Sequence, residues 1–137
     1  MYLSIDLQRA QVMSNLVETV AEDSDSDVQF ELESFQIGSH NFELTTVSYM
    51  PLEKLLTLQS QSKEISGQKL WCGSLCVMEY LLDAPEFLSD SCVVELGAGT
   101  GVVGMLCDHL GARNVFLTDN DVRSLKHMKE DCERNKV

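Results

Sequence analysis

The chain has few basic residues, and this shortage limits the partners it can take. It carries 10 Lys and Arg against 22 Asp and Glu in 137 residues, a formal net charge of -12 at pH 7. A field of this sign repels phosphate backbones and anionic lipid headgroups. We therefore expect no nucleic-acid partner and no membrane partner.

Long hydrophobic runs and paired cysteines are also missing. No apolar run approaches the roughly 18 residues that a membrane span requires, and the N-terminus lacks the basic flank and apolar core of a signal peptide. These absences predict a protein of the cytosol or nucleus. The cysteines form no C-x-x-C pair, which predicts reduced, mostly buried thiols and no metal site; they are Cys72, Cys76, Cys92, Cys107 and Cys132.

Residue patterns divide the chain into three parts, of which the first two are 1–27 and 28–66. Apolar residues at helical spacing predict an N-terminal helix over 4–20, and Glu22 to Asp27 form an acidic linker or, alternatively, a phosphorylation-prone serine tract. Apolar and polar residues alternate on both sides of Gly38-Ser39, which predicts a β-hairpin. A connecting segment follows, in which Pro51 could begin a short helix.

The third part, 67–137, is predicted to be α/β. Ser74 can cap a helix that Pro85 ends, and an apolar strand follows over 92–96. A helix ending at a left-handed Gly111, a second strand over 114–118 and a helix over 121–135 complete the order. Strand, glycine-rich turn, helix, strand is half of a doubly wound α/β sheet, in which both strands are expected to be buried on both faces.

The turn "GAGTGVVG" fits a dinucleotide site in one register. Gly99-x-Gly101-x-x-Gly104 matches the dinucleotide fingerprint, and Asp119 lies where an acid for the ribose is expected. This register would make the protein an NAD(P)-dependent oxidoreductase. The spacing alone leaves that alternative open.

A second register starts at a carboxylate. Glu95-x-Gly97-x-Gly99-x-Gly101 matches the first motif of class I S-adenosylmethionine-dependent methyltransferases. A pyrophosphate has no use for Glu95 beside the turn, because like charges at short range repel. A zwitterionic ligand that bears a sulfonium can use that carboxylate.

Three stretches together resemble a known family. "GQKLWCGSLCVMEYLL", "VVELGAGTGVVGMLCDHLGARNVFLTDND" and "ERNKV" are similar to the methyltransferase-like, protein-lysine-modifying group of seven-strand methyltransferases. The resemblance implies a Rossmann-like doubly wound fold, S-adenosyl-L-methionine as cofactor, and methyl transfer to a protein side chain, with lysine as the expected target. It implies that the cofactor contacts Trp71, Glu95, Gly97, Ala98, Gly99, Gly101 and Asp119. Cys72 departs from the group, which often has Asp after the Trp.

Structural roles compete with several of these assignments. Trp71 could belong to the core, and Glu95 could cap the following helix while also serving a ligand. Asp119 could be an N-cap, with Asn120 and Asp121 as rivals. His40, His109 and His127 have no partner at catalytic spacing and are expected at the surface.

The resemblance leaves the reacting side of the site unassigned. A seven-strand fold requires further strands, and its substrate-binding residues would lie beyond Val137, so we expect a fragment or truncated product of a longer enzyme. No catalytic residue and no oligomeric state is predicted. Two parallel strands seldom form a stable sheet, so residues 1–137 alone are expected to fold poorly and to transfer no methyl groups. A cofactor-binding or interaction module without catalysis is the third alternative.

Overall fold

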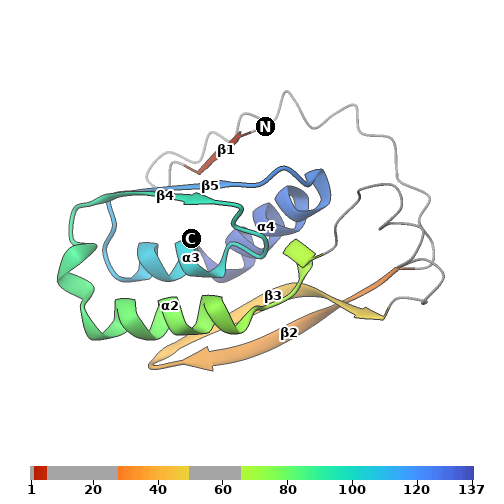
Figure 1. The fold of residues 1–137 in the computed structure, drawn as a ribbon, viewed down its shortest axis with the longest axis horizontal. Helices are drawn as coiled ribbons and strands as arrows, with labels where there is room; N and C mark the ends of the chain where they lie inside the picture. Colours follow the sequence, from red (N-terminus) through yellow and green to blue (C-terminus); the bar gives the residue numbers. More distant parts are fainter. Residues whose placement is uncertain (1, 6–27, 50–65) are drawn as a thin grey trace.

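The computed structural model describes residues 2–5, 28–49 and 66–137, which form a mixed α/β structure (Figure 1). Its elements in chain order are β1 (Tyr2–Ile5), β2 (Gln29–Ile37), β3 (His40–Tyr49), η2 (Ser66–Gln68), α2 (Cys72–Asp83), η3 (Pro85–Phe87), β4 (Cys92–Leu96), α3 (Val102–His109), β5 (Asn114–Thr118) and α4 (Val122–Asn135).

The larger sheet has the order β1-β5-β4. β4 and β5 are parallel, with Val93 opposite Val115, and α3 makes the connection between them. This confirms the predicted strand, turn, helix, strand unit. β1 pairs antiparallel with the other edge of β5, so the predicted helix over 4–20 is wrong at Ser4 and Ile5. There the hydrogen-bonding edge of β5 outweighs local helical spacing; the rest of that predicted helix, the acidic linker and the segment at Pro51 lie outside the described residues.

The second sheet is the predicted hairpin of β2 and β3. Its turn is at Gly38, whose φ of 55° is the left-handed conformation that glycine adopts without steric cost. Cross-strand partners share a face, and Phe35 stacks on Phe42 at 5.5 Å between ring centroids. Phe42 and Leu44 are fully buried, which turns this face toward the body of the protein.

Helices α3 and α4 separate the two sheets. In Figure 1 they lie between the β1-β5-β4 sheet and a layer formed by α2 and the hairpin. The buried side chains that fill this space come from every layer and include Phe42, Met78, Leu106, Leu117 and Met128. The core is therefore on one side of the larger sheet.

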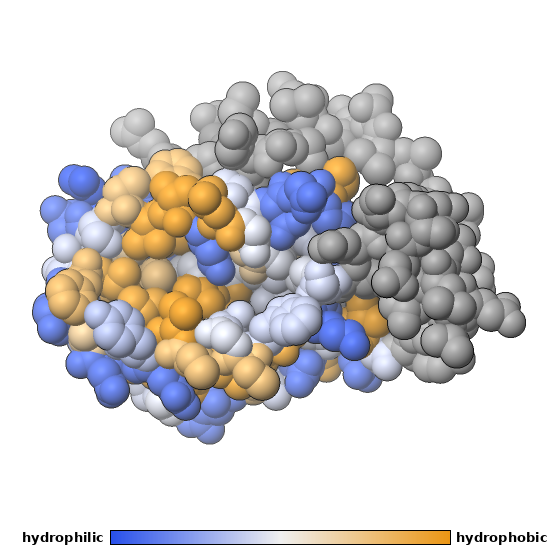
Figure 2. Space-filling model, in the orientation of Figure 1, coloured by the Kyte–Doolittle hydropathy of each residue, from blue (hydrophilic) through white to orange (hydrophobic). Residues whose placement is uncertain are grey.

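The other face of β4 is open. Val94 is 59% exposed and Leu96 is 79% exposed, so the prediction that both faces of this strand are buried is wrong. The helices pack only against the face that holds Val93 and Glu95, because α3 and α4 lie on the same side of the sheet. Figure 2 shows apolar side chains gathered over the region of β4 and α2.

The helix ends differ in detail from the predictions. α2 begins at Cys72 and has Trp71 as N-cap, so Ser74 is inside the helix, where its amide donates to the Trp71 carbonyl at 3.0 Å. Pro85 follows the end of α2 as predicted. α3 ends at His109, and Gly111 is left-handed with φ 94°. Within the described residues, no helix is both long enough and apolar enough to cross a bilayer.

The cysteines are free, but the prediction that most are buried is wrong. Cys72 and Cys76 are exposed on α2, and Cys92 is exposed on β4. Those two elements are incompletely covered, which explains the exposure. Burial raises the pKa of Cys107 to about 11 and that of Cys132 to about 12.

Candidate functional site

The glycine-rich stretch forms the predicted turn from strand to helix. Gly97, Gly99 and Gly101 have φ values of 65°, 57° and 75°, all in the left-handed region. Gly101 is the N-cap of α3. Residues with a Cβ atom are strained in this backbone conformation. The three alternate glycines therefore allow the chain to reverse direction within a few residues.

Close contacts impose glycine at two of these positions. A Cβ at Gly99 would lie 2.7 Å from the Gly67 carbonyl oxygen, and one at Gly101 would lie 2.6 Å from Met128 Cγ. A Cβ at Gly97 would meet nothing within 4 Å. The loop is therefore pressed against η2 and α4 at Gly99 and Gly101, and faces open space at Gly97.

Glu95, near the end of β4, supports the start of α3. Its Oε2 atom accepts a hydrogen bond from the Gly104 amide at 2.9 Å. Burial raises the pKa of Glu95 to about 7, while the Gly104 hydrogen bond acts in the opposite direction. The helix-capping role considered for Glu95 is therefore confirmed, and a role toward a ligand stays a prediction.

Asp119 joins the ends of two loops. It follows β5 directly, and its Oδ2 atom accepts from the Gly99 amide at 2.9 Å while Oδ1 accepts from the Asp121 amide at 2.9 Å. Asp119 is not the N-cap of α4; that residue is Asp121, whose Oδ1 accepts from the Arg123 amide at 3.2 Å. The Asp119 carboxylate therefore orders the glycine loop against the turn that leads into α4.

Trp71 is on the surface of the site and not in the core. Its side chain is 57% exposed, and the indole Nε1 donates to the Ser66 carbonyl at 2.7 Å. As the N-cap of α2 it is fixed between η2 and that helix. An exposed, oriented indole offers apolar area to a ligand.

These residues surround one cavity of about 270 Å³, which we call the glycine-loop cavity. Every residue predicted to contact the cofactor lines it except Gly101, which lies beneath the loop. The lining consists of Ser66, Gly67, Lys69, Trp71, Ser74, Glu95, Gly97, Ala98, Gly99, Thr100, Asp119, Asn120 and Asp121. The sequence thus predicts residues that the structure brings together from three segments.

Sequence reasoning missed the contribution of the segment before Trp71. Gly67 lies under Gly99, and the buried Gln68 donates from Nε2 to Asp121 Oδ2 at 2.9 Å. The stretch "GQKLW" is part of the family resemblance. Its place in that resemblance was the one signal that Gly67 and Gln68 could belong to the site. Its backbone packing against the glycine loop depends on tertiary contacts that no local pattern shows.

The packing at Gly104 and the position of Glu95 argue against the dinucleotide alternative. A Cβ at Gly104 would lie 2.1 Å from Leu117 Cδ2, so close packing of α3 on β5 requires this glycine for any ligand. The start of α3, where a pyrophosphate would accept backbone hydrogen bonds, already holds the Glu95 carboxylate on the Gly104 amide. A second negative group there would be repelled.

The histidines lie away from this cavity. His109 is exposed as predicted, whereas His40 and His127 are half-buried, and the His127 ring meets Phe30 edge-on at 4.5 Å. Burial lowers the pKa of His127. Among the described residues, no group of three or more His, Cys, Asp or Glu could hold a metal ion.

Comparison with known proteins gives a consistent set of matches. A family model described as "Lysine methyltransferase" matches residues 51–137. The chain is 29% identical over 87 residues to "Protein N-terminal and lysine N-methyltransferase EFM7" of Cryptococcus neoformans, covering 62% of this chain and 29% of that protein. It is 43% identical over 53 residues to "Protein N-lysine methyltransferase METTL21A" of Xenopus tropicalis, covering 39% and 24%. The matched segments thus span about a quarter of each relative's length.

Proposed function

The chain belongs to the lysine methyltransferase family, and on that basis we propose that this protein transfers a methyl group from S-adenosyl-L-methionine to a lysine side chain of a protein substrate. The family's activity generally implies this cofactor. The two relatives carry names that specify protein and lysine methylation, which supports a protein substrate.

The observation that carries the proposal is the pair of carboxylates at the glycine loop. Glu95 and Asp119 both line the glycine-loop cavity, and each holds a backbone amide of the turn or of α3. The two carboxyl groups favour a ligand with positively charged groups over a pyrophosphate, although burial leaves Glu95 only partly ionised at neutral pH. S-adenosylmethionine carries a sulfonium and an ammonium group, so Glu95 and Asp119 suit it as a ligand.

We assign the cavity residues as follows. Gly97, Ala98 and Gly99 would lie under the methionine and ribose portions of the cofactor, where the open space at Gly97 leaves room for it. Asp119 would accept the ribose hydroxyls, and the exposed indole of Trp71 would flank the ligand. Gly101 acts from beneath, through its contact with Met128, by fixing the turn.

When bound, the cofactor supplies an electrophilic methyl carbon on sulfur. The lysine nitrogen forms a bond to that carbon as the carbon–sulfur bond breaks, so alignment of the two groups supplies much of the acceleration. The amine must first lose a proton, because lysine with a pKa near 10.4 is almost entirely protonated at neutral pH. The carboxylates that line the cavity in the described part of the chain already accept hydrogen bonds, so no base is assigned.

We also propose a fold and a cellular location for the complete protein. We infer that β4-α3 and β5-α4 are the first two units of a Rossmann-like doubly wound sheet, preceded by the hairpin segment of 28–66. We also propose a protein of the cytosol or nucleus. The acidic net charge of -12 supports the proposal that it does not bind nucleic acid.

Calorimetric titration tests the cofactor. We expect the complete protein to bind S-adenosylmethionine or S-adenosylhomocysteine and not NAD. Binding of NAD without either sulfur compound would favour the oxidoreductase alternative. Incubation of the complete protein with methyl-labelled cofactor and a protein mixture, followed by amino-acid analysis, tests the reaction; label on residues other than lysine would contradict the proposed target. Cofactor binding by the complete protein without any transfer would favour a non-catalytic module.

A further inference from the structure

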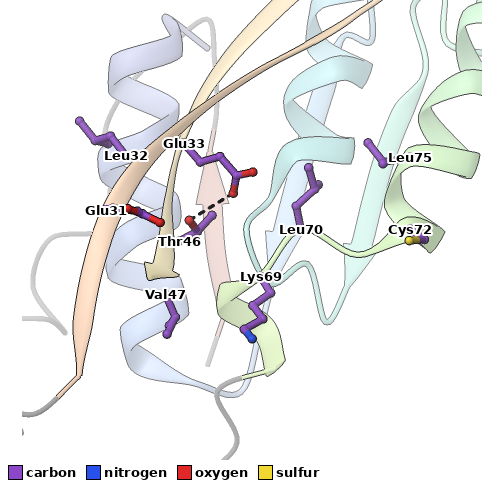
Figure 3. A pocket seen from close by; sticks show the side chains of 9 residues that line it. All are labelled: Glu31, Leu32, Glu33, Thr46, Val47, Lys69, Leu70, Cys72 and Leu75. Atoms are coloured by element: carbon purple, nitrogen blue, oxygen red, sulfur yellow. Dashed lines mark hydrogen bonds between the residues drawn. The ribbon is translucent and has the colours of Figure 1, made fainter. Parts of the chain in front are cut away.

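A second cavity adjoins the proposed cofactor site. It has a volume of about 460 Å³ and is lined by Glu31, Leu32, Glu33, Thr46, Val47, Lys69, Leu70, Cys72 and Leu75. We call it the hairpin groove (Figure 3). Lys69 lines both the hairpin groove and the glycine-loop cavity, so the two spaces lie side by side.

The groove is unusual because two carboxylates stand on the inward face of the hairpin. Glu31 is opposite Thr46 and Glu33 is opposite Leu44, and cross-strand partners share a face. Thr46 and Leu44 are buried, so this face is turned toward the body of the protein. Apolar side chains normally occupy such a face. Here the space in front of the glutamates is the hairpin groove.

One carboxylate is held in place. The Thr46 hydroxyl donates to Glu33 Oε2 at 3.3 Å. Figure 3 shows Glu31 and Glu33 on β2 at one side of the groove, with Leu70, Cys72 and Leu75 at the other and Lys69 near one end. Within the described residues neither glutamate has an ion-pair partner. Both glutamates are exposed, so a ligand in the groove can reach their carboxylates.

The rest of the lining suits the stem of a long basic side chain. Leu32, Val47, Leu70 and Leu75 contribute apolar surface, and Leu32 is more than half exposed. Lys and Arg bury an aliphatic stem on such surface while the charged end binds a carboxylate. An anionic ligand would meet two glutamates and one lysine in a chain that is already strongly negative.

We propose that the hairpin groove binds a basic segment of the protein substrate, next to the lysine that is presented at the glycine-loop cavity. This rests on the proposed function, because it assigns the groove to the substrate of that reaction. Glu31 and Glu33 are binding residues, and they recognise Lys or Arg near the target lysine. The substrate class is thus a protein with a cluster of basic residues.

The test compares two double variants with the same change in net charge. E31Q/E33Q removes the groove carboxylates, and E79Q/E86Q removes two exposed carboxylates that line neither cavity. The probe is a fluorescein-labelled peptide of alternating Lys and Ala, with alternating Glu and Ala as the acidic control. Fluorescence anisotropy is recorded without cofactor, and S-adenosylhomocysteine binding is measured separately by calorimetry.

We expect E31Q/E33Q to weaken binding of the basic peptide about tenfold or more, in line with the loss of two charge-assisted contacts. E79Q/E86Q should change it less than about twofold, since it alters only the screened long-range field. Equal losses in both variants, or no binding of the basic peptide by the unmodified chain, would overturn the proposal. S-adenosylhomocysteine binding should be unchanged in both variants. If the unmodified chain does not bind S-adenosylhomocysteine, that result contradicts the proposed function. It does not contradict the proposed role of the hairpin groove.

Discussion

Asp131 of α4 accepts two hydrogen bonds from Thr45 of β3. The Thr45 amide donates to Oδ2 and the Thr45 hydroxyl donates to Oδ1, each at 2.8 Å. Asp131 is fully buried and is also paired with Arg134. Four residues further along α4, Asn135 bonds the Glu43 amide and carbonyl at 2.9 and 2.8 Å. Side chains of α4 thus satisfy the edge of β3, and this holds the hairpin on the α/β part.

The first prediction concerns this attachment. Asp131→Ala should lower the free energy of unfolding by about 2 to 4 kcal/mol, because it leaves the Thr45 donors and Arg134 without their buried acceptor. Urea unfolding followed by circular dichroism measures the change. Glu130→Gln is the control, since Glu130 is exposed on the same helix. Equal stability of the Asp131→Ala variant and the unmodified chain would show that the hairpin is held by apolar packing alone.

The second prediction separates the glycines. Gly99→Ala should abolish measurable cofactor binding and cost about 1 to 3 kcal/mol of stability, because φ 57° strains alanine and the Cβ would lie 2.7 Å from the Gly67 carbonyl. Gly73→Ala is the matched control in α2. A Cβ there meets nothing within 4 Å, so better helix propensity should raise stability by up to about 1 kcal/mol. Thermal unfolding and calorimetry measure both effects.

Features of the fold that depend on local patterns can be predicted from the sequence, and features that depend on tertiary contacts cannot. The hairpin turn at Gly38 and the parallel strands around the glycine loop follow from alternation, apolar runs and glycine spacing, which act over short distances. The size and apolar area of an indole permit a place in the core for Trp71. It is exposed because α2 begins immediately after it and directs it toward η2.

Long-range contacts were beyond prediction. Thr45 and Asp131 are separated by 86 residues in the sequence. Neither residue type indicates a buried hydrogen-bonded pair. The hairpin groove was missed for the same reason, since Glu31 and Glu33 look like the polar half of an alternating strand. Their pairing with the buried Thr46 and Leu44 across the hairpin shows that they face inward.

The third prediction is a pH dependence of stability. The pKa of Glu95 is raised to about 7 in the folded chain from 4.5, so the folded state binds a proton more tightly than the unfolded state. The stability that this proton contributes is present below about pH 4.5 and is lost as the pH rises through 7. Glu95→Gln keeps an acceptor for the Gly104 amide without the charge. It should match the unmodified chain at pH 5 and exceed its stability by about 2 to 3 kcal/mol at pH 8.5.

Urea unfolding at several pH values between these limits tests this difference, and comparison of the two proteins cancels other titrating groups. A difference that does not change with pH would mean that Glu95 is ionised throughout and that the Gly104 hydrogen bond outweighs burial.

The fourth prediction concerns the open face of β4. The exposed Val94 and Leu96 predict self-association through β4 at high concentration. Leu96→Thr should weaken it about tenfold, because a largely exposed Leu contributes roughly 1.5 kcal/mol when another molecule covers it. Val77→Thr on α2 is the control, since Val77 is also exposed and lies on a helix without an open strand edge. Sedimentation velocity measures association. Equal effects of both changes would point to general surface hydrophobicity and not to β4.

The last prediction is the role of Asp119 toward the cofactor. Asp119→Ala should weaken S-adenosylhomocysteine binding by about 1.5 to 3 kcal/mol, because it removes the proposed acceptor for the ribose hydroxyls and the acceptor of the Gly99 amide. Asp119→Asn tells these effects apart. Its remaining carbonyl oxygen can hold only one of the Gly99 and Asp121 amides. The free energy of unfolding should therefore fall less than in Asp119→Ala, while the charge-assisted bond to ribose is lost.

Asp90→Asn is the control for Asp119→Asn, because Asp90 is exposed, lines neither cavity and has a left-handed backbone that asparagine tolerates. Calorimetry should show weaker binding only in the two Asp119 variants, and urea unfolding should show a larger loss of stability in Asp119→Ala than in Asp119→Asn. Undiminished binding by Asp119→Asn would mean that this carboxylate only orders the loop. In that case the ribose must be held by another acceptor on the cavity wall, of which Asn120 is the nearest in sequence.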